Sequence, residues 1–361
     1  MATTGNALMK NDDSYRLDIQ HHFLTSKYIE ALAKAGVTEA GGEGYPQWTP
    51  EDSLSIMDRY EIDTAIISEP LPVWYLESPK KAAEMARSLN EVGAQCVARW
   101  PRRFGLFAML PLPDIDAALS EIDYALDTLH VDGIVLLSNY AGIYLGDPRF
   151  EPIFAELDRR AAVVYIHPTI STGSEVPSGH FAGSPVPTIQ PSLLEFVFDT
   201  TRAVANLVTS GSLSRYPHLR IILAHAGGTV PYLAGRIIDR SGIVSLYQKA
   251  QAGQAAPPST EMLQHAVETA KEESLSQLSK LFYDTVFSAN IHVMSSLRQL
   301  VPARQILFGT DYPFAQEIGV RYALDELAAF PGFNQQERKE IEGKNALTLF
   351  PRLQEELQPS T

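Results

Sequence analysis

Side chains that can bind a metal ion or move a proton stand at the ends of several short apolar runs. These are His22 in R-L-D-I-Q-H-H-F (Arg16–Phe23), His167 in I-H-P, His225 in L-A-H-A-G-G and Asp311 in F-G-T-D-Y-P. Imidazole and carboxylate groups are common ligands of divalent metals and common groups in general acid–base catalysis. A single buried histidine is more often a hydrogen-bonded structural residue. The prediction of a site therefore depends on the position that these residues share.

The first of these runs predicts a buried strand with an unusual polar face. Alternate side chains of a strand share a face, so Asp18, Gln20 and His22 should point one way and His21 the other. Burial of an unpaired polar group costs a few kcal/mol. We therefore expect a metal, a substrate or a hydrogen-bond network at this face.

The elements that position these residues alternate between strand and helix. Eight apolar runs predict strands near 16–23, 64–69, 104–110, 132–137, 162–167, 220–225, 282–287 and 306–311, and a helical pattern follows each one. Continuous apolar runs are typical of parallel strands buried on both faces. The pattern predicts a single (β/α)8 barrel, with insertions after strands 1, 5 and 6; a doubly wound open sheet is the structural alternative. Catalytic groups of such barrels gather at the carboxyl ends of the strands, where His22, Glu69, His167, His225 and Asp311 fall.

Length and composition limit the other possibilities. The 361 residues divide into an N-terminal arm at 1–15 and one barrel at 16–361, and a hydrophobic content of 45% suffices for a large core. The net charge of −14 argues against nucleic acid or an anionic membrane as the main partner. With a single cysteine and no apolar run of about 20 residues, we expect a cytoplasmic protein without a membrane span.

Four motifs resemble one family. D-x-x-H-H-F, I-H-P, H-A-G-G-T-V-P-Y-L-A-G-R and F-G-T-D-Y-P-F are similar to the amidohydrolase-related family, in its aminocarboxymuconate-semialdehyde decarboxylase branch. Residues 193–207 (L-L-E-F-V-F-D-T-T-R-A-V-A-N-L) resemble the 6-methylsalicylate decarboxylase group. The resemblance implies a barrel that holds one divalent metal ion, usually zinc or manganese.

The resemblance also assigns roles to residues. It places Gln20 and His22 at the two first-strand metal positions, His167 at the third and Asp311 at the carboxylate position, while His225 acts on substrate or water. The family has a histidine where this chain has Gln20. Three alternatives follow: the amide oxygen of Gln20 binds the metal, water replaces it, or the site has lost its metal.

The expected reaction is the non-oxidative decarboxylation of a small salicylate-like acid. Asp311 would donate a proton to the ring carbon that bears the carboxylate, and His225 would assist. The same groups could hydrolyse a lactone, or the barrel could bind a small acid without turnover. Some members of the family that take dicarboxylates use an arginine from the loop after strand 1, and here Phe23–Asp58 contains none. The resemblance therefore implies an aromatic monocarboxylate under a lid that includes Trp48 and Tyr45; alternatively, Trp48 only packs the loop.

Arg236 belongs to the motif P-x-x-x-G-R. In the family this arginine enters the pocket of the neighbouring subunit and pairs with the substrate carboxylate. The resemblance therefore implies a homodimer in which Arg236 completes the partner's site; alternatively, Arg236 is a solvated or salt-bridged surface residue.

Overall fold

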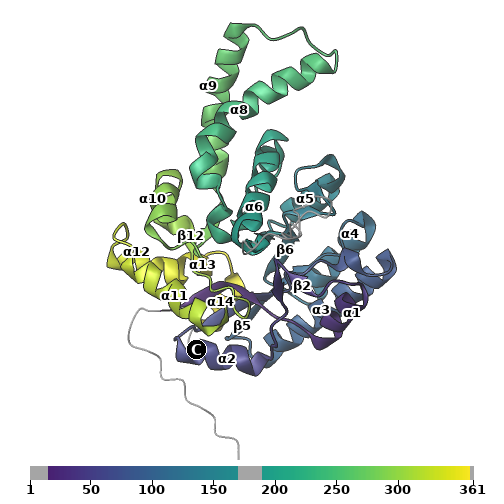
Figure 1. The fold of residues 1–361 in the computed structure, drawn as a ribbon, viewed down its shortest axis with the longest axis vertical. Coiled ribbons are helices and arrows are strands. Elements are labelled where there is room, and N and C mark those ends of the chain that lie inside the picture. Colours follow the sequence, from purple (N-terminus) through teal and green to yellow (C-terminus); the bar gives the residue numbers. More distant parts are fainter. Residues whose placement is uncertain (1–14, 170–188, 358–361) are drawn as a thin grey trace, which may run out of the picture.

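Eight parallel strands form the centre of the computed structural model, which describes residues 15–169 and 189–357 (Figure 1). Their order in the sheet is that of the chain: β1 (Leu17–His22), β4 (Thr64–Ser68), β5 (Phe104–Met109), β6 (Gly133–Leu137), β9 (Val163–His167), β10 (Arg220–Leu223), β11 (Phe282–Asp284) and β12 (Ile306–Leu307). The sheet curves round on itself. Backbone N–H groups of Ile19 and His22 donate to the carbonyls of Phe308 and Tyr312, at 3.0 and 2.7 Å. The predicted (β/α)8 barrel is confirmed, and the open-sheet alternative is wrong.

The strands are buried on both faces, because helices cover the outside of the barrel. One main helix follows each strand: α2 (Pro50–Arg59), α3 (Pro79–Arg99), α4 (Ile115–Asp123), α5 (Glu151–Arg159), α6 (Pro191–Thr209), α8 (Val230–Gln251), α10 (Ile291–Leu300) and α11 (Gln316–Ala329). Thr49, Ser78 and Asp114 accept hydrogen bonds from backbone N–H groups and so cap α2, α3 and α4. These helices therefore begin where polar capping residues precede the apolar pattern.

Helix α9 and several shorter elements complete the described chain. They are α1 (Ser26–Lys34), α7 (Ser212–Arg215), α9 (Thr260–Leu278), α12 (Gln335–Lys339), α13 (Asn345–Leu347), α14 (Pro351–Leu357), and the hairpins β2–β3 (Glu39–Ala40, Glu43–Gly44) and β7–β8 (Asn139–Tyr140, Ile143–Tyr144). The hairpin β2–β3 lies in the long segment after the first strand. Helices α8 and α9 form a pair that projects from the barrel (Figure 1). Within the described residues, no helix is both long and apolar enough to cross a membrane.

Two predicted features differ from the structure or lie outside it. Tyr15 is not part of a loose arm, because its hydroxyl lies 2.5 Å from the Thr64 hydroxyl; the rest of the predicted arm lies outside the described residues. Most of the predicted insertion after strand 5, at 170–191, also lies outside the described residues. The predicted insertion after strand 6 corresponds to the extended α8 and α9.

Candidate active site

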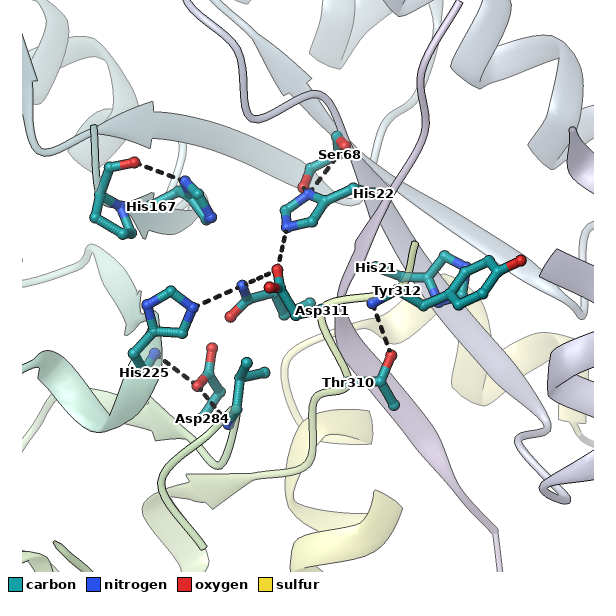
Figure 2. Close-up of polar contacts among 12 residues, drawn as sticks. His21, His22, Ser68, His167, His225, Asp284, Thr310, Asp311 and Tyr312 are labelled. Carbon is teal, nitrogen blue, oxygen red and sulfur yellow. Dashed lines mark hydrogen bonds and ion pairs between the residues drawn. The ribbon is translucent and has the colours of Figure 1, made fainter. Parts of the chain in front are cut away.

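Three side chains from distant parts of the chain meet at the carboxyl end of the barrel. His22 ends β1, His167 ends β9, and Asp311 follows β12. One potential ligand atom from each lies within 4.8 Å of the other two, and all three residues are buried. Figure 2 shows these side chains facing one another across the barrel end. The structure thus brings together the three residues that the strand-end pattern places here.

The hydrogen bonds of His22 leave one ring nitrogen facing a carboxylate. His22 Nδ1 lies 3.3 Å from the carbonyl oxygen of Ser68, and His22 Nε2 lies 2.9 Å from Oδ1 of Asp311. Nδ1 also lies 3.2 Å from Oγ of Ser68, whose hydroxyl can donate to it, so Nε2 can carry the ring proton and donate to Asp311. With the proton on Nδ1 instead, Nε2 and the carboxylate oxygen are two acceptors that can bind one cation together.

His167 is fixed in a similar way. Its Nδ1 donates to the carbonyl oxygen of Pro168, at 2.8 Å, which leaves Nε2 as the free nitrogen. Burial, with the nearby His22 and His225, lowers the pKa of His167 well below its usual value. His167 is therefore neutral at neutral pH, which is the form of imidazole that binds a metal.

Asp311 is ionised in the free protein. Burial raises its pKa, but the hydrogen bond with His22 and the attraction of the surrounding imidazole rings outweigh burial, and the net pKa is below its usual value. Asp311 and His225 both have left-handed backbone angles, with φ of 64° and 53°. Such angles in residues other than glycine are unfavourable and are common at active sites.

Gln20 lies beside the three potential ligands. Its Nε2 donates to Oδ1 of Asp311, at 2.7 Å, and to Nε2 of His225, at 3.1 Å. Its Oε1 is buried and has no hydrogen-bond partner. In this rotamer the amide nitrogen faces the group, and turning the amide over would bring the oxygen to the same place. The three alternatives for Gln20 therefore stay open.

Asp18 does not join this group, contrary to the alternation expected for the strand. The pairing of β1 with β4 shifts register between Asp18 and His21. The Asp18 carboxylate accepts hydrogen bonds from His21 Nδ1, at 2.9 Å, and from the backbone N–H of Thr310, at 3.0 Å. Asp18 thus helps to close the barrel. Glu69 also stays outside the group; its Oε1 accepts the N–H of Leu71, at 3.1 Å.

Asp284 is a buried acid that the sequence analysis missed. It ends β11, and its Oδ1 accepts the backbone N–H groups of His225, at 2.7 Å, and Val286, at 3.0 Å. Its Oδ2 accepts the hydroxyl of Tyr165, at 3.2 Å. Burial raises the pKa of Asp284 to about 8. The sequence predicted this strand at 282–287, and because the strand ends three residues earlier, at Asp284, the strand-end rule did not single this residue out.

A cavity of about 830 Å³ opens over His167, His225 and Asp311. Its walls are mostly apolar or aromatic and include Tyr45, Leu71, Tyr75, Phe196, Phe287 and Phe314. Among the described residues, no lysine or arginine lines it, and its acidic members besides Asp311 are Glu39 and Glu43. The cavity suits a flat apolar ring better than a polyanion.

Trp48 lies away from this cavity, whereas Tyr45 from the same loop lines it. The Trp48 ring packs against Phe23, with centroids 5.9 Å apart, and its Nε1 donates to Oγ of Ser53, at 2.8 Å. This position favours the alternative in which Trp48 packs the loop. Arg236 lies on α8 with an exposed side chain.

A family model described as amidohydrolase matches residues 17–352. The chain belongs to the amidohydrolase family. A decarboxylase of Aspergillus niger is 35% identical over 94% of this chain and 88% of its own length. A 6-methylsalicylic acid decarboxylase of Aspergillus aculeatus is also 35% identical, over 94% of this chain and 96% of its own length.

A solved structure of a related decarboxylase has the same fold. The crystal structure of a 2,6-dihydroxybenzoate decarboxylase from Rhizobium matches with a TM-score of 0.70 and 25% identity. The match covers 94% of this chain and 99% of that chain.

Proposed function

We propose that this amidohydrolase is a divalent-metal-dependent, non-oxidative decarboxylase of a small salicylate-like aromatic acid. The observation that carries the proposal is the group His22, His167 and Asp311, whose potential ligand atoms lie within 4.8 Å of one another beneath a largely apolar cavity. The names of the related decarboxylases support the reaction type.

His22, His167 and Asp311 would hold the metal, zinc or manganese, with Gln20 in or beside its ligand shell. Oε1 of Gln20 has no hydrogen-bond partner and would join the shell with the amide turned over, and Nε2 of His22 lies 2.9 Å from Oδ1 of Asp311, close enough for both atoms to bind one ion. When bound, such an ion neutralises and orients the carboxylate and phenolate of the substrate.

Asp311 would move the proton that the reaction needs. Because it is ionised in the free protein, it can accept the phenolic proton as the substrate binds. It then donates this proton to the ring carbon that bears the carboxylate. The bond between that carbon and the carboxylate breaks, its electron pair returns to the ring, and CO₂ leaves. The nearby substrate carboxylate makes the protonated form of Asp311 more favourable, because like charges disfavour ionisation.

His225 would hydrogen-bond the substrate oxygen. Burial lowers its pKa, so it is a neutral imidazole that can donate through one nitrogen and accept through the other. Asp284 fixes the backbone of His225 and would keep the ring in place.

The substrate would be a monocarboxylate. Glu39 and Glu43 disfavour a second acidic group, and no described cation of this chain lines the cavity. The exposed Arg236 would reach the carboxylate of a substrate in a neighbouring subunit, so we propose a homodimer. A guanidinium pairs with a carboxylate through two parallel hydrogen bonds.

The test is CO₂ release by the purified protein after chelation, dialysis and reloading with manganese or zinc. Salicylic and 6-methylsalicylic acids are the substrates. We expect no turnover without metal, turnover after reloading, and none by a reloaded Asp311→Asn variant. A protein that binds metal but releases no CO₂ from either acid would contradict the proposal, and so would full activity after chelation.

A further inference from the structure

A buried carboxylate joins helix α6 to the segment that follows strand β6. Asp199 accepts hydrogen bonds from Asn139 Nδ2, at 2.8 Å, and Tyr144 Oη, at 2.5 Å, and also from the Ser138 hydroxyl. All three donors come from the segment that follows β6, and Asp199 is only 7% exposed. The carboxylate thus ties the helix to the end of a barrel strand.

The same hydrogen-bond network reaches the strand that carries His167. The N–H of Thr169 donates to the Ser138 hydroxyl, at 3.0 Å, and Asn139 Nδ2 donates to the Thr169 carbonyl, at 2.9 Å. The N–H of Ser138 donates to the His167 carbonyl, at 2.9 Å. Asp199 therefore connects three parts of the site: the end of β6, the end of β9 and helix α6.

One turn before Asp199, the same helix contributes Phe196 to the cavity wall. Residues three apart share a face of a helix, so fixing Asp199 fixes the direction of Phe196. The Phe196 ring meets the His167 ring edge-on, with centroids 6.2 Å apart. Asp199 itself does not line the cavity and can act on a substrate only through such neighbours.

The tip of hairpin β2–β3 holds the other side of Phe196. The N–H of Ser192 donates to the Gly41 carbonyl, at 3.0 Å. A Cβ at Gly41 would lie 2.9 Å from Cζ of Phe196, so the glycine backbone lies directly against the ring. Phe196 therefore has little freedom while α6 stays in place.

We propose that Asp199 is a positioning residue for substrate selection. By fixing α6, it holds Phe196 between Gly41 and His167 and sets the width of the cavity next to the substrate ring. This inference rests on the proposed function, in which the cavity accepts an aromatic acid. The size of the substituents that the substrate ring can carry then depends on the Asp199 carboxylate, which does not contact the substrate.

The main variant is Asp199→Asn. All three side chains that meet Asp199 are donors, so an amide must turn its own NH₂ group toward at least one of them. Tyr144→Phe is the milder variant, because it removes one donor and keeps the carboxylate. Asp147→Asn is the matched control: it removes a carboxylate from the same region whose side chain bonds Arg149 instead.

Two measurements are made on each metal-loaded variant. The first is the ratio of kcat/KM for 6-pentylsalicylic acid to that for salicylic acid. The second is hydrogen exchange of the backbone amides at 192–198. For Asp199→Asn we expect the ratio to rise about tenfold, mainly through KM, since discrimination of this size is usual for apolar pockets. Exchange at 192–198 should speed up, because a loosened segment opens more often. Tyr144→Phe should show smaller shifts in both, and Asp147→Asn none.

A merely structural role would lower stability without moving the ratio. Unchanged ratio and unchanged exchange in both Asp199→Asn and Tyr144→Phe would overturn the inference, as would a ratio that shifts equally in Asp147→Asn. If the wild-type protein turns over neither salicylic nor 6-methylsalicylic acid, the proposed function fails. The ratio of the binding constants of 6-pentylsalicylic and salicylic acid, from titration calorimetry, then replaces the kinetic ratio, and failure of both of these acids to bind overturns the inference as well.

Discussion

The amide of Gln20 stands where the family pattern has a metal-binding histidine, and its environment gives it two possible uses. Its NH₂ group now joins Asp311 to His225, while its oxygen is buried without a partner. An amide oxygen is a weaker ligand than imidazole for zinc. Whether Gln20 belongs to the ligand shell can be measured through metal affinity.

Replacement of Gln20 by histidine should tighten zinc binding. An added imidazole ligand should lower the dissociation constant by at least about tenfold, as measured by competition with a chromogenic chelator. Gln336→His is the control, because it adds an imidazole on exposed helix α12. Equal affinities for Gln20→His and the wild type would place Gln20 outside the ligand shell.

Asp311→Asn and His225→Ala separate proton transfer from folding. The carboxamide introduced by Asp311→Asn cannot accept and return a proton, so turnover should be abolished while thermal unfolding remains cooperative. His225→Ala should lower kcat by about 10²–10⁴, the usual contribution of a general acid or base. Near-normal rates in either variant would rule out the role given to that residue.

The raised pKa of Asp284 predicts that the stability of the protein depends on pH. Its pKa is about 8 in the folded protein and near 4 when unfolded, so between these values the folded state binds more protons. Its contribution to the free energy of unfolding is therefore greatest near pH 4 and is lost as the pH rises toward 8, by at most about 1.4 kcal/mol per pH unit.

The measurement is urea unfolding of Asp284→Asn and the wild type at pH 5 and pH 8. The difference in stability between the two pH values should be smaller in the variant, because Asn does not titrate. An equal difference in the two proteins would show that Asp284 is ionised throughout this range.

Single residues were predictable where a simple rule applied. His22, His167, His225 and Asp311 were found because polar groups at strand ends meet in this fold. Trp48 could not be placed, because an aromatic residue in a long loop carries no periodic signal. Asp18 was misplaced because the register shift before His21 depends on pairing with β4 and Thr310, which are distant in sequence.

At the scale of elements, buried strands were the most predictable feature, since an apolar run with a following helix specifies a parallel strand. The hairpins β2–β3 and β7–β8 were missed. Each strand in them has two residues, too few to show alternation. Their positions depend on tertiary contacts, such as the hydrogen bond between Gly41 and Ser192.

The turn between β10 and α8 provides a test at this scale. Gly228 has φ of 66°, and a Cβ there would lie 2.0 Å from the carbonyl oxygen of Val197 on α6. Gly228→Ala should lower the free energy of unfolding by more than about 2 kcal/mol, through both strain and collision. Gly44→Ala, with open space at its Cβ position, is the control for urea unfolding and should change little. Equal free energies of unfolding for Gly228→Ala and the wild type would show that the turn does not need a glycine.

At the scale of the whole molecule, helix α8 exposes an aromatic residue and an arginine that have no evident role within a single chain. Tyr232 is 83% exposed and lies one turn before the exposed Arg236 on the same helix. Residues four apart share a helix face. An aromatic residue beside an arginine is a common composition at protein interfaces, which supports the proposed homodimer.

Mixing two inactive variants tests whether Arg236 serves the partner's site. Asp311→Asn and Arg236→Ala should each be inactive alone. A heterodimer has one site with both lesions and one with neither, so activity should return after subunit exchange, toward a quarter of the wild-type value at equal mixing. Verified exchange without recovered activity would contradict this role, and so would a monomer at working concentration.

The most direct test of the central claim is the reaction of the metal-loaded protein with salicylic acid in D₂O, followed by NMR of the product. Decarboxylation with proton transfer to the ring predicts phenol with one deuterium ortho to the hydroxyl, at the carbon that carried the carboxylate. If the protein leaves both salicylic and 6-methylsalicylic acid unchanged, or gives products that keep the carboxylate, the account is contradicted.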